Sequence, residues 1–223
     1  MRNAPTMAVL KKAIPRVKAA SSASHEAFLD TARDRSEDDR DPVPASLEPS
    51  ETRRFAREIG TAVHGVLEEL DLDGDQDQEC VRALQRIPLE LANLVPPDEL
   101  EQATEMARTL VAKLADSQLM GKLFALSDHV VGREVPLLHN EKGDGPTVVG
   151  AIDLLYRDPG SGEYVIADYK TDRVPDDEGL QSRARTYRAQ GEAYIRAVQD
   201  ALGLENPPRF ELWFLHHDEV VDA

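Results

Sequence analysis

Three successive segments with strand periodicity lie in the middle of the chain, and they constrain its fold more than any other feature. The segments are HVVGREVPLLH (residues 129–139), PTVVGAIDLLYRD (146–158) and GEYVIADYK (162–170), and the turn sequences EKGDG and PGSG join them. Short connections rich in Gly, Asp and Pro between such segments are typical of hairpins. We therefore expect a three-stranded meander whose apolar faces need covering helices.

Helical periodicity flanks these strands on both sides. The order of helices, three strands, helix and strand predicts an α/β fold, with a mixed sheet flanked by helices and a helical N-terminal part. The expected elements are a helix from the N-cap Ser50 to about Asp71, helices at 77–94 and 98–126 separated by the break Val95-Pro96-Pro97, a long helix at 178–203, and a last strand at 208–217.

The first 50 residues have a different composition from the rest. The segment MRNAPTMAVLKKAIPRVKAASSAS is basic, and Lys11, Lys12 and Pro15 interrupt its apolar residues, which disfavours a secretory signal. Residues 21–50 are rich in Ser, Asp, Arg and Pro, as in disordered linkers. We interpret residues 1–50 as a tail left from a preceding domain, in preference to a transit peptide, and assign residues 51–223 to one domain.

Composition narrows the functional classes. Hydrophobic residues make up 41% of the 223 residues, which supports a packed core, and no apolar run approaches the roughly 20 residues of a membrane span. The single cysteine, Cys80, excludes an internal disulfide and a four-cysteine iron–sulfur site within the chain. We expect a cytoplasmic protein that does not bind membranes. The net charge of −16 argues against a protein whose main task is binding nucleic-acid phosphates.

Three charged residues interrupt the apolar strand segments. Asp168 and Lys170 are two residues apart, so their side chains share one face of a strand, about 6–7 Å apart. If the second and third strands pair, Asp153 lies beside Asp168 at about 5 Å. Two such carboxylates repel each other unless a cation lies between them, and burying them unpaired costs several kcal/mol. A divalent metal site is favoured over a buried ion pair, because one lysine leaves one acid unmatched.

At these residues the chain resembles a known family. GAID and, fourteen residues later, the start of ADYKTD resemble the Asp…Asp-x-Lys core of the PD-(D/E)XK nucleases. Three further segments are similar to the RecB-type branch, the C-terminal nuclease domain of AddA and RecB helicase–nucleases. They are GTAVHGVLE with His64, REVPLL with Glu134, and YRAQGEAY with Gln190 and Tyr194. The five features occur in the family's order and cover about residues 51–223, and the fold they imply is restriction-endonuclease-like.

The resemblance implies hydrolysis of DNA phosphodiesters with Mg²⁺, or with Mn²⁺ in its place, in the exonuclease module of a recombinational-repair enzyme. The implied metal ligands are the carboxylates of Asp153 and Asp168, the backbone carbonyl of Tyr169 and the imidazole of His64. Lys170 would orient the attacking water or stabilise the transition state. The remaining implied roles are a second acid or second-metal ligand for Glu134, and DNA contact or bracing of the metal ligands for Gln190 and Tyr194.

Partners and alternatives follow from the same comparison. A basic strip lies around the motif strand and the following helix, formed by Arg173, Arg183, Arg185, Arg188 and Arg196. A helicase domain or subunit would then supply most of the DNA affinity. The chain has no helicase motifs and lacks the clustered cysteines of the iron–sulfur relatives of the AddB and Cas4 types, which favours the AddA-like side. The alternatives are a free-standing Cas4-like or restriction-type nuclease, and a catalytically silent domain, against which the presence of Asp153, Asp168 and Lys170 argues.

Overall fold

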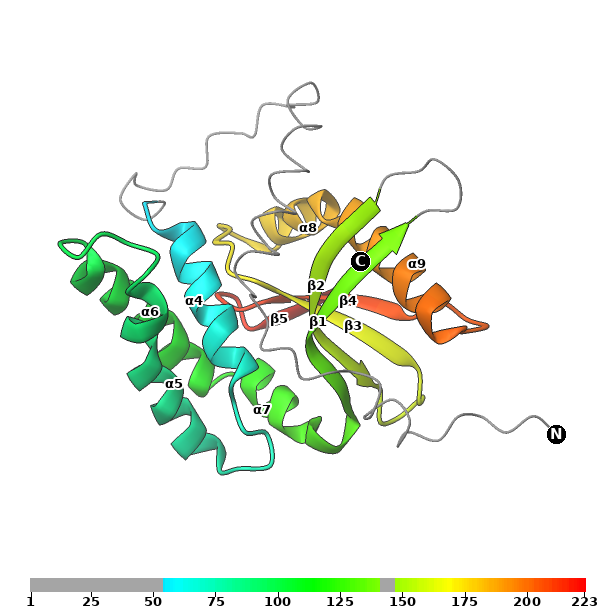
Figure 1. Ribbon diagram of the computed structural model, residues 1–223, viewed down its shortest axis with the longest axis horizontal. Coiled ribbons are helices and arrows are strands. Elements are labelled where there is room, and N and C mark those ends of the chain that lie inside the picture. The colour runs from blue at the N-terminus through cyan, green and yellow to red at the C-terminus, as the bar shows by residue number, and fades with distance from the viewer. Residues whose placement is uncertain (1–53, 141–146) are drawn as a thin grey trace, which may run out of the picture.

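A mixed five-stranded sheet forms the centre of the protein (Figure 1). The structure, a computed structural model, describes residues 54–140 and 147–223, so the expected tail at 1–50 and the N-cap Ser50 lie outside the described residues. The strands follow the sheet order β1-β2-β3-β4-β5, in which β3 and β4 are parallel and the other neighbours are antiparallel. Their bounds are Val130–Asn140 (β1), Thr147–Arg157 (β2), Tyr164–Lys170 (β3), Arg209–Phe214 (β4) and Glu219–Asp222 (β5).

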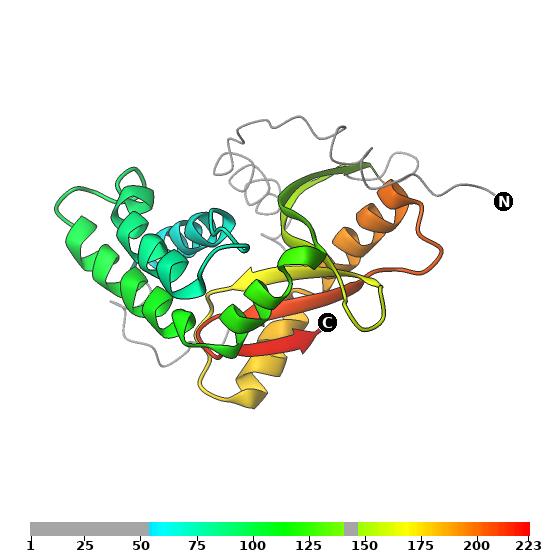
Figure 2. The same cartoon turned by 90° about the horizontal axis from the view of Figure 1, so that it is seen from below.

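Six α-helices among the described residues cover the two faces of the sheet. Figures 1 and 2 show α4 to α7 on one side of the sheet and α8 and α9 on the other. Within the described residues, no helix combines the length and the hydropathy needed to cross a lipid bilayer. The helices are Ala56–Glu68 (α4), Gln76–Leu91 (α5), Leu100–Ala115 (α6), Gln118–Ala125 (α7), Asp177–Thr186 (α8) and Arg188–Leu202 (α9), with a 3₁₀ turn at Ser127–His129 (η1).

Alternation along β3 separates the two apolar cores. Val165, Ala167 and Tyr169 are buried against the helices α4 to α7. Ile166 is buried on the opposite face, in the core that α8 and α9 cover. Because successive side chains of a strand point to opposite faces, Asp168 and Lys170 fall on the Ile166 side. The expected meander is therefore present, and the motif strand β3 lies at the centre of the sheet.

Two expected long helices are each divided in two, which corrects the prediction. The segment expected as one helix at 98–126 breaks at Ser117, whose hydroxyl accepts a hydrogen bond from the Met120 amide at 3.1 Å and so caps α7. The segment expected as one helix at 178–203 breaks at Tyr187, which ends α8 and precedes α9. Local capping groups and tertiary contacts outweigh helical periodicity at both positions.

The C-terminal segment also differs from the prediction. The strand expected at 208–217 ends at Phe214, and a turn with a positive φ of 57° at Asp218 leads into β5. The Asp218 carboxylate accepts hydrogen bonds from the amides of Gln118 and Leu119 at 2.9 and 2.8 Å. These bonds satisfy amides in the first turn of α7 and fix the turn that returns the chain along β4. A four-residue edge strand has too little sequence pattern to be predicted.

Candidate functional site

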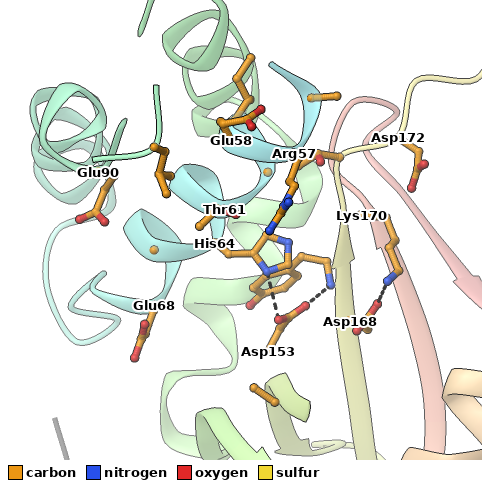
Figure 3. A pocket seen from close by; sticks show the side chains of 18 of the residues that line it. Arg57, Glu58, Thr61, His64, Glu68, Glu90, Asp153, Asp168, Lys170 and Asp172 are labelled. Carbon is orange, nitrogen blue, oxygen red and sulfur yellow. Dashed lines mark hydrogen bonds and ion pairs between the residues drawn. The ribbon is translucent and has the colours of Figure 1, made fainter. Parts of the chain in front are cut away.

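A cavity of about 820 Å³ opens between α4, the ends of β2 and β3, and α9 (Figure 3). The cavity lining includes His64, Asp153, Asp168, Lys170 and further residues from the motif segments. Residues far apart in the sequence meet here because β3 is the central strand and helices pack on both of its faces. The cavity lies at the C-terminal end of β3, where the apolar strand pattern gives way to charged residues.

The ladder between β2 and β3 opens at the two aspartates. Its pairs end at Leu154↔Ala167, one position before Asp153 and Asp168 would pair. Beyond this point Asp153 Oδ2 accepts a hydrogen bond from the Tyr169 amide at 2.5 Å. A side-chain carboxylate thus replaces the backbone acceptor that β2 would have supplied. Figure 1 shows β1 and β2 running across the direction of β3 to β5, which leaves room for the cavity. We expected the two aspartates to be neighbours across a continuous ladder; they lie instead where it ends.

Glu134 reaches the same place through an unusual backbone conformation. The flanking pairs Arg133↔Leu154 and Val135↔Ile152 put Glu134 opposite Asp153. Its φ of 44° lies in the left-handed region, which costs a residue with a Cβ on the order of 1 kcal/mol. Ligand atoms of Glu134, Asp153 and His64 all lie within 4.8 Å of one another.

Helix α4 supplies the imidazole of this cluster. Its residues Val63, Val66 and Leu67 are buried in the core, which fixes the helix over the sheet. His64 Nδ1 then lies 3.1 Å from Asp153 Oδ1, and its ring meets the Tyr169 ring edge-on at 5.8 Å. A Cβ at Gly60 would be 3.1 Å from Thr171 Oγ1, so this glycine allows α4 to approach the end of β3 closely.

Protonation of the cluster reflects two carboxylates and one imidazole in a buried site. Burial disfavours the charged imidazole, but the attraction and hydrogen bond of Asp153 outweigh it and raise the pKa of His64 to about 9. Burial and repulsion by Asp153 raise the pKa of Glu134 to about 8. Burial opposes ionisation of Asp153 as well, but His64 and the Tyr169 amide hold its pKa below its ordinary value. Protons therefore supply the positive charge that this acidic cluster requires.

Asp168 and Lys170 form a second pair on the other side of β3, as Figure 3 shows. Asp168 is 4% exposed, and burial raises its pKa although the Lys170 ammonium opposes this. Apart from the ion pair with Lys170, Asp168 Oδ2 is buried without a hydrogen-bond partner among the described residues. Asp168 is thus outside the cluster of His64, Glu134 and Asp153, and it carries an oxygen with unused acceptor capacity.

Helix α9 holds the second pair through one amide. Gln190 Nε2 lies 3.3 Å from Asp168 Oδ1 and 3.2 Å from the Tyr194 hydroxyl, and Gln190 Oε1 accepts from Lys170 Nζ at 3.3 Å. Tyr194 is buried, and a Cβ at Gly150 in β2 would lie 2.7 Å from its hydroxyl. Gln190 and Tyr194 therefore contact the site residues directly, one helical turn apart.

The arginines of the expected basic strip divide into two groups. Arg173 and Arg183 line the cavity, whereas Arg185 and Arg188 are exposed on α8 and α9 outside it. Arg183 is bound to Asp172, with its Nε 2.8 Å from Oδ1. Arg173 Nε lies 3.3 Å from Nε2 of His216.

His216 is suited to accept a hydrogen bond from Arg173. Burial and the charge of Arg173 lower the pKa of His216 to about 4, so the imidazole is neutral near pH 7. His217, its neighbour in the same turn, accepts a hydrogen bond from the Val174 amide at 3.2 Å instead. The two histidines thus have separate partners, in agreement with the expectation that they do not act as a paired ligand set.

Sequence analysis overlooked three residues of the cavity. Asp172 accepts hydrogen bonds from Arg183 and Tyr187, and the Tyr187 ring lies against Lys170. Glu68 also lines the cavity, one helical turn after His64. Tyr187 precedes Gln190 by three residues and Tyr194 by seven, a spacing that predicts one helical face and that could have identified it.

Comparison with known proteins agrees with this arrangement. The family model for the PD-(D/E)XK nuclease superfamily matches residues 33–222. An ATP-dependent helicase/nuclease subunit of Heliobacterium modesticaldum is 30% identical over 167 residues, which is 67% of this chain and 11% of that protein. The ATP-dependent helicase/nuclease subunit of the same name in Desulforamulus reducens is 34% identical over 163 residues, which is 66% of this chain and 12% of that protein.

A third relative, the helicase/nuclease subunit of that name in Bacillus cereus strain AH187, is 27% identical over 185 residues, 74% of this chain and 14% of that protein. The chain thus spans between 11% and 14% of the length of these relatives. The mixed sheet, the order of the motif segments and the match over most of the chain agree with one another. This chain belongs to the PD-(D/E)XK nuclease superfamily.

Proposed function

We propose that this chain is a metal-dependent deoxyribonuclease module that hydrolyses phosphodiester bonds, working as the exonuclease part of a recombinational-repair helicase–nuclease. The observation that supports this most strongly is the position of Asp153, Asp168 and Lys170 where β2 leaves β3, inside a cavity lined by His64. A lysine beside buried carboxylates in an open cavity fits the cleavage of an anionic ester better than it fits a structural core.

We propose Mg²⁺ as the cofactor, with Mn²⁺ as a substitute. The donor set fits such an ion, because the imidazole and two carboxylates of one cluster lie within 4.8 Å and Asp168 Oδ2 has unused acceptor capacity nearby. Asp153, Asp168, His64 and the Tyr169 carbonyl would hold the ion, with Glu134 as an additional ligand or neighbouring acid. When bound, the metal polarises the phosphate and acidifies a water molecule.

The protein's own groups account for positioning and charge stabilisation. Lys170 Nζ donates to the attacking water or to a phosphate oxygen as negative charge develops. Gln190 keeps the ammonium and the Asp168 carboxylate at a fixed separation through its two contacts. Arg173, held by the neutral His216, offers its remaining N–H groups to a neighbouring phosphate of the bound strand.

DNA affinity is the weak property of this module. The net charge of −16 repels phosphates at long range, and Arg183 is already neutralised by Asp172. We propose that a helicase domain or subunit delivers the strand, as the names of the relatives suggest. The module then contributes chemistry more than binding.

A cleavage assay on end-labelled single-stranded and double-stranded DNA tests this proposal, with Mg²⁺ or Mn²⁺ and with EDTA. The wild-type chain should shorten the substrate with metal and leave it intact with EDTA. Asp168→Asn and Lys170→Ala should each reduce the rate at least about 100-fold, the usual cost of losing one such group. Asp177→Asn, which changes an exposed carboxylate of α8, is the matched control. A folded wild-type chain that binds DNA without cutting it would favour the catalytically silent alternative.

A further inference from the structure

We propose that Tyr187 is a positioning residue for Lys170, which it holds in the cavity through the face of its aromatic ring. This inference rests on the proposed nuclease function. Lys170 Nζ lies 3.8 Å from the centroid of the Tyr187 ring. That distance is well inside the roughly 6 Å over which a ring face attracts an ammonium group. The side chain of Lys170 is only 13% exposed, so water weakens this attraction little.

The ring is itself fixed by a chain of polar contacts. The Tyr187 hydroxyl donates to Asp172 Oδ2 at 2.7 Å, and Asp172 Oδ1 accepts from Nε and from a terminal nitrogen of Arg183 at 2.8 and 2.7 Å. Burial and the nearby Asp172 carboxylate raise the pKa of Tyr187, so its hydroxyl stays a donor. Asp172 follows Lys170 by two residues, and Arg183 belongs to α8. The network thus joins the end of the motif strand to the junction of α8 and α9.

The geometry also explains why an aromatic ring suits this position. Lys170 has three contacts: the ion pair with Asp168, the Gln190 amide oxygen at 3.3 Å, and the Tyr187 ring. If Asp168 ligates a cation, Lys170 loses its counter-ion, and the ring and the amide remain to hold it. A ring face attracts the ammonium without taking its proton, whereas a second carboxylate would neutralise it. Lys170 then keeps its N–H groups for the phosphate or the water.

Two substitutions separate the ring from the hydroxyl. Tyr187→Phe keeps the ring face and loses the hydrogen bond to Asp172, whereas Tyr187→Leu loses both. Tyr164→Leu is the matched control, because the Tyr164 ring contacts the Arg157 guanidinium at 4.6 Å at the other end of β3. We expect Tyr187→Leu to lower kcat about tenfold with KM nearly unchanged, and Tyr187→Phe and Tyr164→Leu to stay within about threefold of wild type.

A second measurement does not depend on cleavage. Competitive acylation of the metal-free protein, read by mass spectrometry, reports how freely the Lys170 amine reacts. Tyr187→Leu should raise its labelling rate several-fold, and Tyr187→Phe should not. In a Lys170→Ala background, Tyr187→Leu should cause no further loss of residual activity. If Tyr187→Leu does not fold, Tyr187→Met supplies a side chain of suitable length without a ring.

The outcomes distinguish the inference from the function on which it rests. A Tyr187→Leu protein with wild-type kcat and labelling would overturn the role of the ring. A Tyr187→Phe protein as impaired as Tyr187→Leu would assign the effect to the hydrogen bond with Asp172, and the inference would be wrong. A wild-type chain that cleaves no DNA would overturn the nuclease proposal, while the labelling rates would still decide whether Tyr187 restrains Lys170.

Discussion

Binding of a divalent cation in the cavity should release about two protons at pH 7. The pKa of His64 is about 9 and that of Glu134 about 8, so at pH 7 these groups are about 99% and 90% protonated. A metal ion accepts only a neutral imidazole and an ionised carboxylate, so both protons must leave. At pH 9.5 the same pKa values leave about 0.3 proton to release.

Calorimetric titration of Mn²⁺ into the metal-free protein measures this number. The observed enthalpy is recorded in buffers with different ionisation enthalpies, and its slope gives the protons released per ion bound. His64→Ala and Glu134→Gln should each reduce the release at pH 7 by about one proton, because each removes one of the titrating groups. Glu101→Gln, an exposed acid of α6, should leave it unchanged. A release below half a proton in the wild type, or one unaffected by both substitutions, would refute the reasoning.

The same pKa shifts predict how the metal-free protein responds to pH. The folded-state pKa of His64 is raised above the unfolded value near 6.5, so its stabilising contribution is complete below pH 6.5 and is lost as pH rises through about 9. The loss is on the order of 3 kcal/mol for His64 alone. Glu134 has the same sign between about pH 4.5 and 8. Unfolding by urea at pH 6 and pH 9 should show this decrease, and added Mn²⁺ should reverse it.

Three further predictions concern residues around the site. Gly150→Ala should cost about 1–3 kcal/mol and slow cleavage, because its Cβ would lie 2.7 Å from the Tyr194 hydroxyl; urea unfolding compares it with Gly121→Ala, which has open space and should be neutral or stabilising. Stability should fall as pH drops from about 6.5 to 4, because unfolded His216 takes up a proton that the folded protein excludes; thermal unfolding of wild type and His216→Gln tests this. Arg173→Ala should weaken DNA binding and reduce the salt slope by about one, measured by fluorescence anisotropy.

The fold could be predicted from the sequence largely because strand alternation and turn residues are local signals. The segments expected at 129–139, 146–158 and 162–170 correspond to β1, β2 and β3 within a few residues. The helix breaks at Ser117 and Tyr187 could not be predicted, since the helical pattern continues through both positions. They depend on a hydroxyl cap and on contacts with distant segments.

The candidate site was predictable in membership but not in arrangement. Asp153, Asp168 and Lys170 stand out because charges interrupt apolar strands, and the family resemblance adds His64 from another element. The pairing of His64 with Asp153, and of Asp168 with Lys170, depends on where the β2–β3 ladder ends, which no local pattern encodes. The roles assigned to these residues remain predictions.

The carboxylate of Asp153 occupies the place of a main-chain carbonyl, so this residue belongs to the architecture of the sheet as well as to the site. Asp153→Ala would leave the buried Tyr169 amide without its acceptor, at a cost of about 1–3 kcal/mol. An inactive Asp153 variant would therefore report misfolding and lost chemistry together. Asp168 accepts no backbone amide bond among the described contacts, so Asp168→Asn is the cleaner inactive protein for trapping a complex with DNA.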